Sequence, residues 1–145
     1  MPNHFHLLIK QKRERDIAEF MKSFTTNYSM YFNDRYDRVG TLFQGPYKAV
    51  LVKEDNYLLH LSRYIHTNPL ELVKGENLDK LIKYPYSSYA NYLGKKNTTW
   101  VKPEFILDYF KNNKDQYNID KSSYKEFMED YKYDSKEILG SITID

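Results

Sequence analysis

The 145-residue sequence contains no cysteine. This absence excludes a disulfide scaffold, an iron–sulfur cluster, a zinc site with Cys ligands and a cysteine nucleophile. No apolar run approaches the roughly 20 residues that span a bilayer, and the first residues lack the apolar core of a signal peptide. We therefore expect a soluble cytoplasmic protein without a membrane partner, associated with the nucleoid if it binds DNA.

Hydrophobic residues make up 41% and charged residues 29% of the sequence, which predicts one domain with a buried core. Aromatic residues are frequent at 17%, and 15 of them are tyrosines. Tyrosine serves in packing, base stacking and nucleophilic chemistry, so this composition does not select among those roles.

The small net charge of +2 conceals an uneven distribution. Residues 1–100 carry 15 basic against 10 acidic side chains, whereas residues 101–145 carry 7 against 10. A basic body of this kind is compatible with a polyanionic partner, and equally with an ordinary solvated surface.

Two long helices are predicted. Apolar residues recur at helical spacing over residues 15–31, and Asp16 followed by Glu19 indicates a capping box. The second helix covers residues 55–68 and ends at Pro69. The apolar stripe of the first helix, which predicts core packing, comprises Ile17, Phe20, Met21, Phe24, Tyr28 and Tyr31. Shorter helices are predicted at residues 87–93, 103–110 and 122–131.

Residues 4–9 and 47–53 have the composition of short buried strands, so the sequence predicts an α+β fold. A composition change near residues 95–99 suggests two parts. We expect a catalytic domain over residues 1–97 and a helical, acidic C-terminal extension over residues 98–145.

His4 and His6 would project from the same face of such a strand, where two imidazoles can bind one metal ion. In the second helix Tyr64 and Asn68 are four residues apart and share a face, and His60 lies one turn earlier. A phenol near a metal site could attack phosphorus and form a covalent intermediate. Tyr64 could instead be a packed helix residue, and the two histidines could stand together by chance or lie on the surface.

Four blocks, in order, resemble the single-tyrosine HUH transposases, in their REP-associated branch. They are residues 1–9, which contain His-Phe-His, and residues 40–49, 57–69 and 84–89. The resemblance covers residues 1 to about 94. It implies a ferredoxin-like antiparallel sheet with helices on one face, and an enzyme that cleaves and joins single-stranded DNA near hairpins.

Carried over by position, His4, His6 and Asn68 would bind a divalent ion, Mg²⁺ or Mn²⁺. Tyr64 would be the nucleophile that forms a 5′-phosphotyrosine and frees a 3′-hydroxyl. Tyr57 is a rival nucleophile, but it lies near the helix start and lacks the four-residue link to Asn68. The residues expected to contact DNA are Arg35, Arg38, Phe43, Lys48, Lys53 and Arg63.

Relatives carry some fifty residues before the His-Phe-His strand, so we expect a chain that lacks part of the sheet. A misplaced start codon, decay of the transposable element, or a homodimer that completes the sheet would each account for this. The alternative function is a catalytically inactive remnant that only binds nucleic acid. A two-histidine metal hydrolase without DNA specificity is a third hypothesis.

Overall fold

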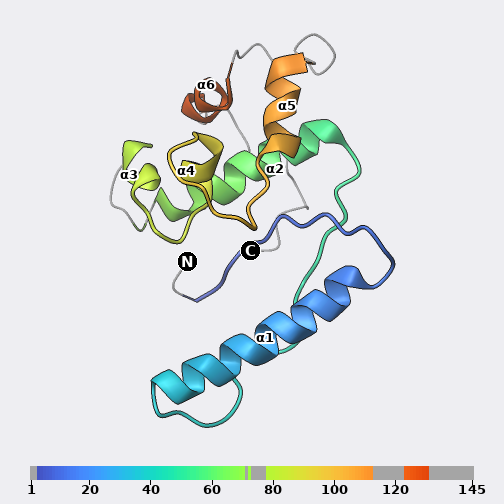
Figure 1. Ribbon diagram of the computed structural model, residues 1–145, viewed down its shortest axis with the longest axis vertical. Helices are drawn as coiled ribbons and strands as arrows, with labels where there is room; N and C mark the ends of the chain where they lie inside the picture. Colours follow the sequence, from blue (N-terminus) through green and yellow to red (C-terminus); the bar gives the residue numbers. More distant parts are fainter. Residues whose placement is uncertain (1–2, 71, 73–77, 113–122, 131–145) are drawn as a thin grey trace. The chain divides into compact units, whose positions relative to one another are not determined.

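The computed structural model describes residues 3–70, 72, 78–112 and 123–130 (Figure 1). Over these ranges it contains helices joined by irregular segments, and no strand. The elements are α1 (Asp16–Arg35), α2 (Asp55–Thr67), the 3₁₀ turn η1 (Asn68–Leu70), α3 (Asp79–Ile82), α4 (Tyr89–Tyr92), α5 (Glu104–Asn112) and α6 (Tyr124–Glu129). None of the described helices is long and apolar enough to cross a membrane.

The predicted α+β fold with a ferredoxin-like antiparallel sheet is therefore wrong for the described chain. Residues 4–9 and 47–53, expected as strands, are irregular. A strand requires a neighbour that takes up its backbone N–H and C=O groups. The apolar composition of these segments cannot supply that neighbour, and no ladder forms between them. The predicted burial is wrong as well, since Phe5, Leu7 and Leu51 are exposed.

Contacts within the described chain define two compact units. The α1 unit comprises residues 7–50, and the core unit comprises residues 3–6 together with the described residues from 51 onward. Each unit is described separately below. The boundary predicted between residues 97 and 98 stays a prediction, although α5 and α6 do form the helices expected in that extension.

Helix α1 extends beyond its predicted end, to Arg35. Asp16 is its first residue, and the Asp16 carboxylate accepts hydrogen bonds from the backbone N–H groups of Arg13 (2.9 Å) and Lys12 (3.3 Å). The prediction of a capping box is therefore wrong, because Arg15 occupies the N-cap position, with φ of 71° and no side-chain cap. Asp16 instead closes the turn before the helix.

The apolar stripe of α1 forms a ladder of rings rather than a buried core. Phe20 and Phe24 stack at a centroid distance of 5.7 Å, and Phe24 and Tyr28 at 6.2 Å. Met21 is the one residue of α1 that is buried, whereas Tyr31 is 62% exposed. Core packing is thus confirmed only for Met21.

Helix α2 starts at Asp55 as predicted, one residue after the N-cap Glu54. The chain leaves the α-helix before Pro69, but Asn68 keeps a right-handed helical backbone and opens η1. Pro69 removes a donor that the α-helix would need, and the tighter turn accommodates this loss.

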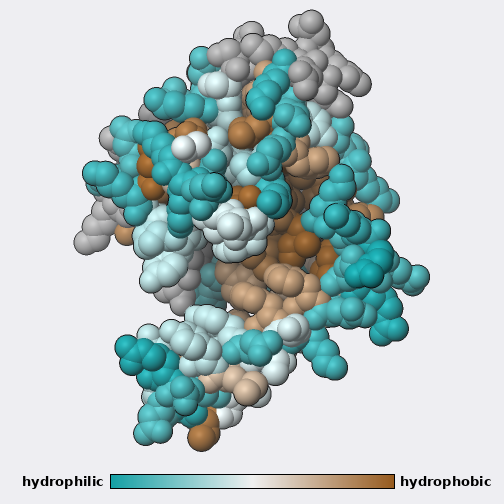
Figure 2. Space-filling view, viewed as in Figure 1, coloured by the Kyte–Doolittle hydropathy of each residue, from teal (hydrophilic) through white to brown (hydrophobic). Residues whose placement is uncertain are grey.

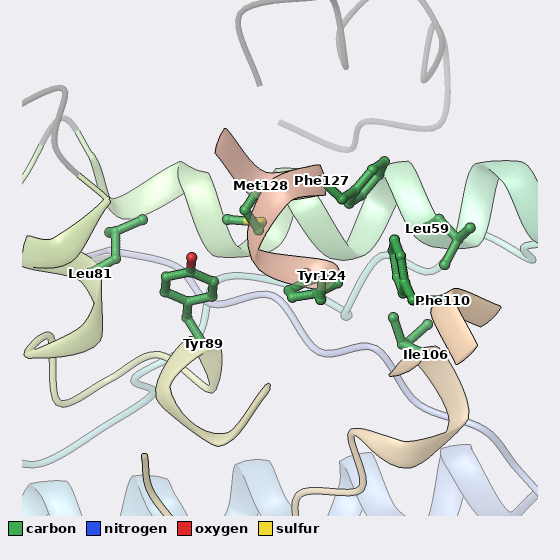
Figure 3. Packing of buried hydrophobic residues seen from close by; sticks show 8 residues of the cluster. All are labelled: Leu59, Leu81, Tyr89, Ile106, Phe110, Tyr124, Phe127 and Met128. Atoms are coloured by element: carbon green, nitrogen blue, oxygen red, sulfur yellow. The ribbon is translucent and has the colours of Figure 1, made fainter. Parts of the chain in front are cut away.

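The core of this unit is built by α2 together with four shorter helices, α3, α4, α5 and α6 (Figure 3). Leu59 of α2 and Leu81 of α3 are almost completely buried. The other buried hydrophobic members are Tyr89 of α4, Ile106 and Phe110 of α5, and Tyr124, Phe127 and Met128 of α6. Burial of such side chains contributes about 1.5–3 kcal/mol each, so this cluster supplies the main stabilisation of the unit. Figure 2 shows hydrophilic residues over much of its outer face, with hydrophobic atoms between them.

Candidate functional site

Three of the predicted site residues surround the ring of His6 inside the core unit. The ring centroid of Tyr64 lies 5.9 Å from that of His6, and that of His4 lies 5.1 Å away, both in edge-to-face arrangements. The Asn68 amide nitrogen lies 3.5 Å from His6 Nε2. The predicted set of two imidazoles, one phenol and one carboxamide therefore comes together, although its members are separated by up to 64 residues.

The spacing of four residues on α2 accounts for half of this convergence. A rotation of 100° per residue places Tyr64 and Asn68 within about 40° of each other on the helix surface. Both side chains are half-buried. The described residues provide no sheet against which α2 could pack, and Leu59 is the α2 leucine that is buried in the core.

The histidine half of the set lies on an irregular segment. His4 is exposed, and its Nδ1 donates a hydrogen bond to Asn3 Oδ1 at 2.8 Å. This bond assigns the ring proton to Nδ1 and makes Nε2 the lone-pair nitrogen. A metal-binding histidine needs this division of roles, with one nitrogen held by an acceptor and the other carrying the lone pair.

Imidazole and carboxamide groups are ligand types that a divalent ion accepts. Two ligands that each lie about 2.1 Å from one ion are roughly 3.0–3.5 Å apart, and the distance between the Asn68 amide and His6 Nε2 falls at the edge of this range. Rotating the Asn68 carboxamide by half a turn would present its oxygen. Among the described residues no group of three or more His, Cys, Asp or Glu side chains could hold a metal ion.

His60 is engaged elsewhere. Arg63 Nη2 donates to His60 Nδ1 at 2.9 Å, and the ring of His60 packs edge-on against Phe127 at 5.4 Å. Burial, together with the nearby Arg63 charge, lowers the pKa of His60 to about 4. His60 is therefore neutral near pH 7, with its lone pair directed at Arg63.

His66 is a buried structural residue and not part of the site. It is 2% exposed, and burial lowers its pKa to about 3. Both ring nitrogens are bonded, Nδ1 with the hydroxyl of Tyr124 and Nε2 with that of Ser88, each at 2.8 Å. This arrangement gives His66 a role in packing within the core unit.

Arg63 occupies a position that argues against the predicted contact with DNA. It is 3% exposed, and its Nη1 donates to the Phe127 carbonyl at 3.0 Å. The guanidinium also lies 4.3 Å from the centroid of the Phe127 ring. Arginine is almost never buried unless it is paired, so the sequence predicts a surface position for Arg63. Its bonds within the core unit assign it to the packing of α6.

The other predicted DNA-contacting residues are divided between the two units. Lys53 is exposed in the core unit. Arg35, Arg38, Phe43 and Lys48 belong to the α1 unit, where Arg38 lies over the Phe32 ring at 5.6 Å and Phe43 packs against Tyr28 at 6.1 Å. Their contacts with DNA remain predictions.

The sequence reading missed three polar residues that organise the core unit, namely Ser62, Ser88 and Tyr124. Ser62 and His66 follow Leu59 at spacings of three and seven residues. That spacing indicates a common helix face, so it could have identified Ser62, the one missed residue on α2. Nothing in the pattern distinguishes Tyr124 from the other tyrosines.

Comparison with known proteins finds a family match. No curated protein matches the chain, and no solved structure matches it. Residues 1–68 match the model of a family described as "Transposase IS200 like". The matched segment includes all four residues of the candidate site, and the match supports a place for this part of the chain in the transposase family.

Proposed function

We propose that the protein cleaves and rejoins single-stranded DNA near hairpins, as a transposase of the single-tyrosine HUH type. The observation that carries the proposal is the convergence of Tyr64, Asn68 and His4 on His6, within 5.9 Å between ring centroids and 3.5 Å between side-chain nitrogens. The match to IS200-like transposases over residues 1–68 supports the same reading.

In the proposed reaction the Tyr64 oxygen attacks a backbone phosphorus. The bond between phosphorus and the 3′-oxygen breaks, the phenol proton is released to solvent, and the 3′-oxygen leaves as a hydroxyl after it takes up a proton. The product is a 5′-phosphotyrosine, which keeps the energy of the phosphodiester, so attack by a 3′-hydroxyl reverses the step without ATP.

His4, His6 and Asn68 would hold a divalent ion, Mg²⁺ or Mn²⁺. When bound, such an ion neutralises charge on the phosphoryl oxygens. The protein's own contribution is orientation: α2 carries the nucleophile and Asn68 is its C-cap residue with a helical backbone, so the helix fixes their mutual position.

The test is the formation of a denaturation-resistant adduct with labelled, hairpin-flanked single-stranded DNA in the presence of Mn²⁺. We expect an adduct from the wild type and none from Tyr64→Phe. Tyr57→Phe is the matched control, because it removes a half-buried phenol from the same helix, and it should retain the adduct. An undiminished adduct in Tyr64→Phe would exclude this nucleophile.

A second experiment addresses the ligands. Replacing both His4 and His6 with Ala should abolish ion-dependent adduct formation but spare most of the electrostatic DNA binding. Adduct formation at the wild-type rate in this double variant would show that the metal assignment is wrong.

A second candidate function is nucleic-acid binding without turnover. It is favoured by the irregular backbone of residues 3–10, because a strand would hold the two imidazoles more rigidly. DNA binding by the wild type without any adduct, under permissive ion conditions, would select this function.

A further inference from the structure

Helix α2 presents two chemically different faces. Tyr64 and Asn68 turn toward His6, whereas Ser62, Arg63 and His66 are each at most 3% exposed. At 100° per residue the centres of these two groups lie on opposite sides of the helix. The rotation of α2 about its own axis therefore sets both the buried contacts and the direction of Tyr64.

The buried face makes hydrogen bonds whose direction is determined throughout. Ser62 Oγ donates to the Leu59 carbonyl at 2.7 Å, because a carbonyl can only accept. Having only one proton, Ser62 must accept from the Tyr124 hydroxyl, 3.1 Å away. The Tyr124 oxygen then accepts from His66 Nδ1–H, and His66 Nε2 accepts from the Ser88 hydroxyl.

This chain of hydrogen bonds requires a neutral His66 and a protonated Tyr124. His66 and Tyr124 are each 2% exposed, so the hydrogen bonds that they make lie away from solvent. Because each donor and acceptor has one assigned role, the chain is satisfied in one orientation of α2 relative to α6.

Arg63 adds a second connection between the same two helices. Its guanidinium donates to the carbonyl of Phe127, in the last turn of α6, where helix carbonyls lack internal partners. The same guanidinium binds His60 and lies over the Phe127 ring. Arg63 thus links the end of α6 to two successive turns of α2.

Hydrogen bonds fix the rotation of a helix about its axis more strictly than apolar packing does. An apolar face tolerates small rotations, since hydrophobic contacts have no preferred direction. A rotation of α2 would break bonds on the buried face and leave buried polar atoms unsatisfied, which is costly. The same rotation would turn Tyr64 and Asn68 away from His6.

We propose that Tyr124 and Arg63 are positioning residues, which hold α2 in the rotation that presents Tyr64 and Asn68 to His6. The catalytic part of this inference rests on the proposed function. The inference also makes α6 part of the machinery of the site, although it lies outside the segment that matches the transposase family.

The test compares Tyr124→Phe and Arg63→Met with Tyr86→Phe, a matched control at a position that is 84% exposed. Two quantities are measured on the full chain: the rate of adduct formation relative to the affinity for single-stranded DNA, and the ¹⁵N imidazole NMR signals of His6. We expect Tyr124→Phe to slow adduct formation about tenfold to a hundredfold, to leave DNA affinity within about twofold, and to shift the His6 signals. Tyr86→Phe should change none of these.

Unchanged His6 signals in folded Tyr124→Phe would overturn the proposal, whatever the adduct rate. Shifted signals with an adduct rate within about twofold of wild type would overturn the catalytic role. If the wild type itself forms no adduct, the proposed function fails, and the His6 signals alone still decide whether α6 positions the site. Tyr124→Phe retains the buried ring, so it tests whether α6 positions the site even if Arg63→Met does not fold.

Discussion

The buried histidine on α2 makes stability depend on pH in a way that can be calculated. His66 is 2% exposed and has a pKa of about 3 in the folded chain, against an ordinary value of 6.5. Between these values the unfolded chain binds more protons than the folded one. The free energy of unfolding therefore falls as the pH falls below about 6.5, and the loss continues toward pH 3.

One pH unit corresponds to about 1.4 kcal/mol for a single group. A pH of about 5 lies roughly 1.5 units below the ordinary pKa of histidine. Protonation of His66 in the unfolded chain should therefore lower the free energy of unfolding by about 2 kcal/mol relative to about pH 7. This is a large fraction of the stability of a small domain.

The assay is urea unfolding at the two pH values, followed by circular dichroism. Burial lowers the pKa of His60 to about 4, so His60 adds to the same pH dependence, and the comparison is made with His66→Gln, which has no titrating ring. The difference between the two pH values should be about 2 kcal/mol smaller in His66→Gln than in the wild type. His60→Gln, measured in parallel, separates the contribution of the second histidine. Equal pH dependence in wild type and His66→Gln would show that His66 is not held neutral by burial.

Two further substitutions test the construction of the core unit. Leu81→Ala removes a side chain with 0% exposure and should lower the free energy of unfolding by about 2–5 kcal/mol in urea titrations, whereas a loss below about 1 kcal/mol would mean that α3 does not pack as described. Ser123→Ala removes the hydroxyl that accepts from the Glu126 N–H at 3.3 Å and should cost about 1 kcal/mol, and Ser123→Asp, which also caps, should restore most of it; equal stability of all three chains would exclude the cap.

The sequence predicted those parts of the fold that local chemistry decides. Helix α2 was located because the 3.6-residue period and Pro69 are both local signals. The strands were wrong because residues 4–9 and 47–53 carry a strand-like composition but pair with no strand in the described chain. Helix α3 was missed, since four residues give too short a period to recognise.

The candidate site was predicted only in part, for a related reason. The four-residue spacing of Tyr64 and Asn68 is visible in the sequence, and the resemblance added His4 and His6. Arg63 was misread as a surface cation because its partner carbonyl is 64 residues away. Long-range hydrogen bonds leave no periodic trace, so the role of Tyr124 could emerge only from the folded chain.

The segment that matches the transposase family and the residues that hold its main helix are different parts of the chain. Residues 1–68 include α2 and the candidate site. The buried side of α2, however, is covered by Leu81, Tyr89, Ile106 and the α6 residues, all of which follow the matched segment. An isolated fragment of residues 1–68 would expose Leu59, Arg63 and His66, and Arg63 would lose the carbonyl that it binds. The direction of Tyr64 is therefore a property of the core unit as a whole, and the chemistry proposed for residues 1–68 depends on helices that lie beyond them.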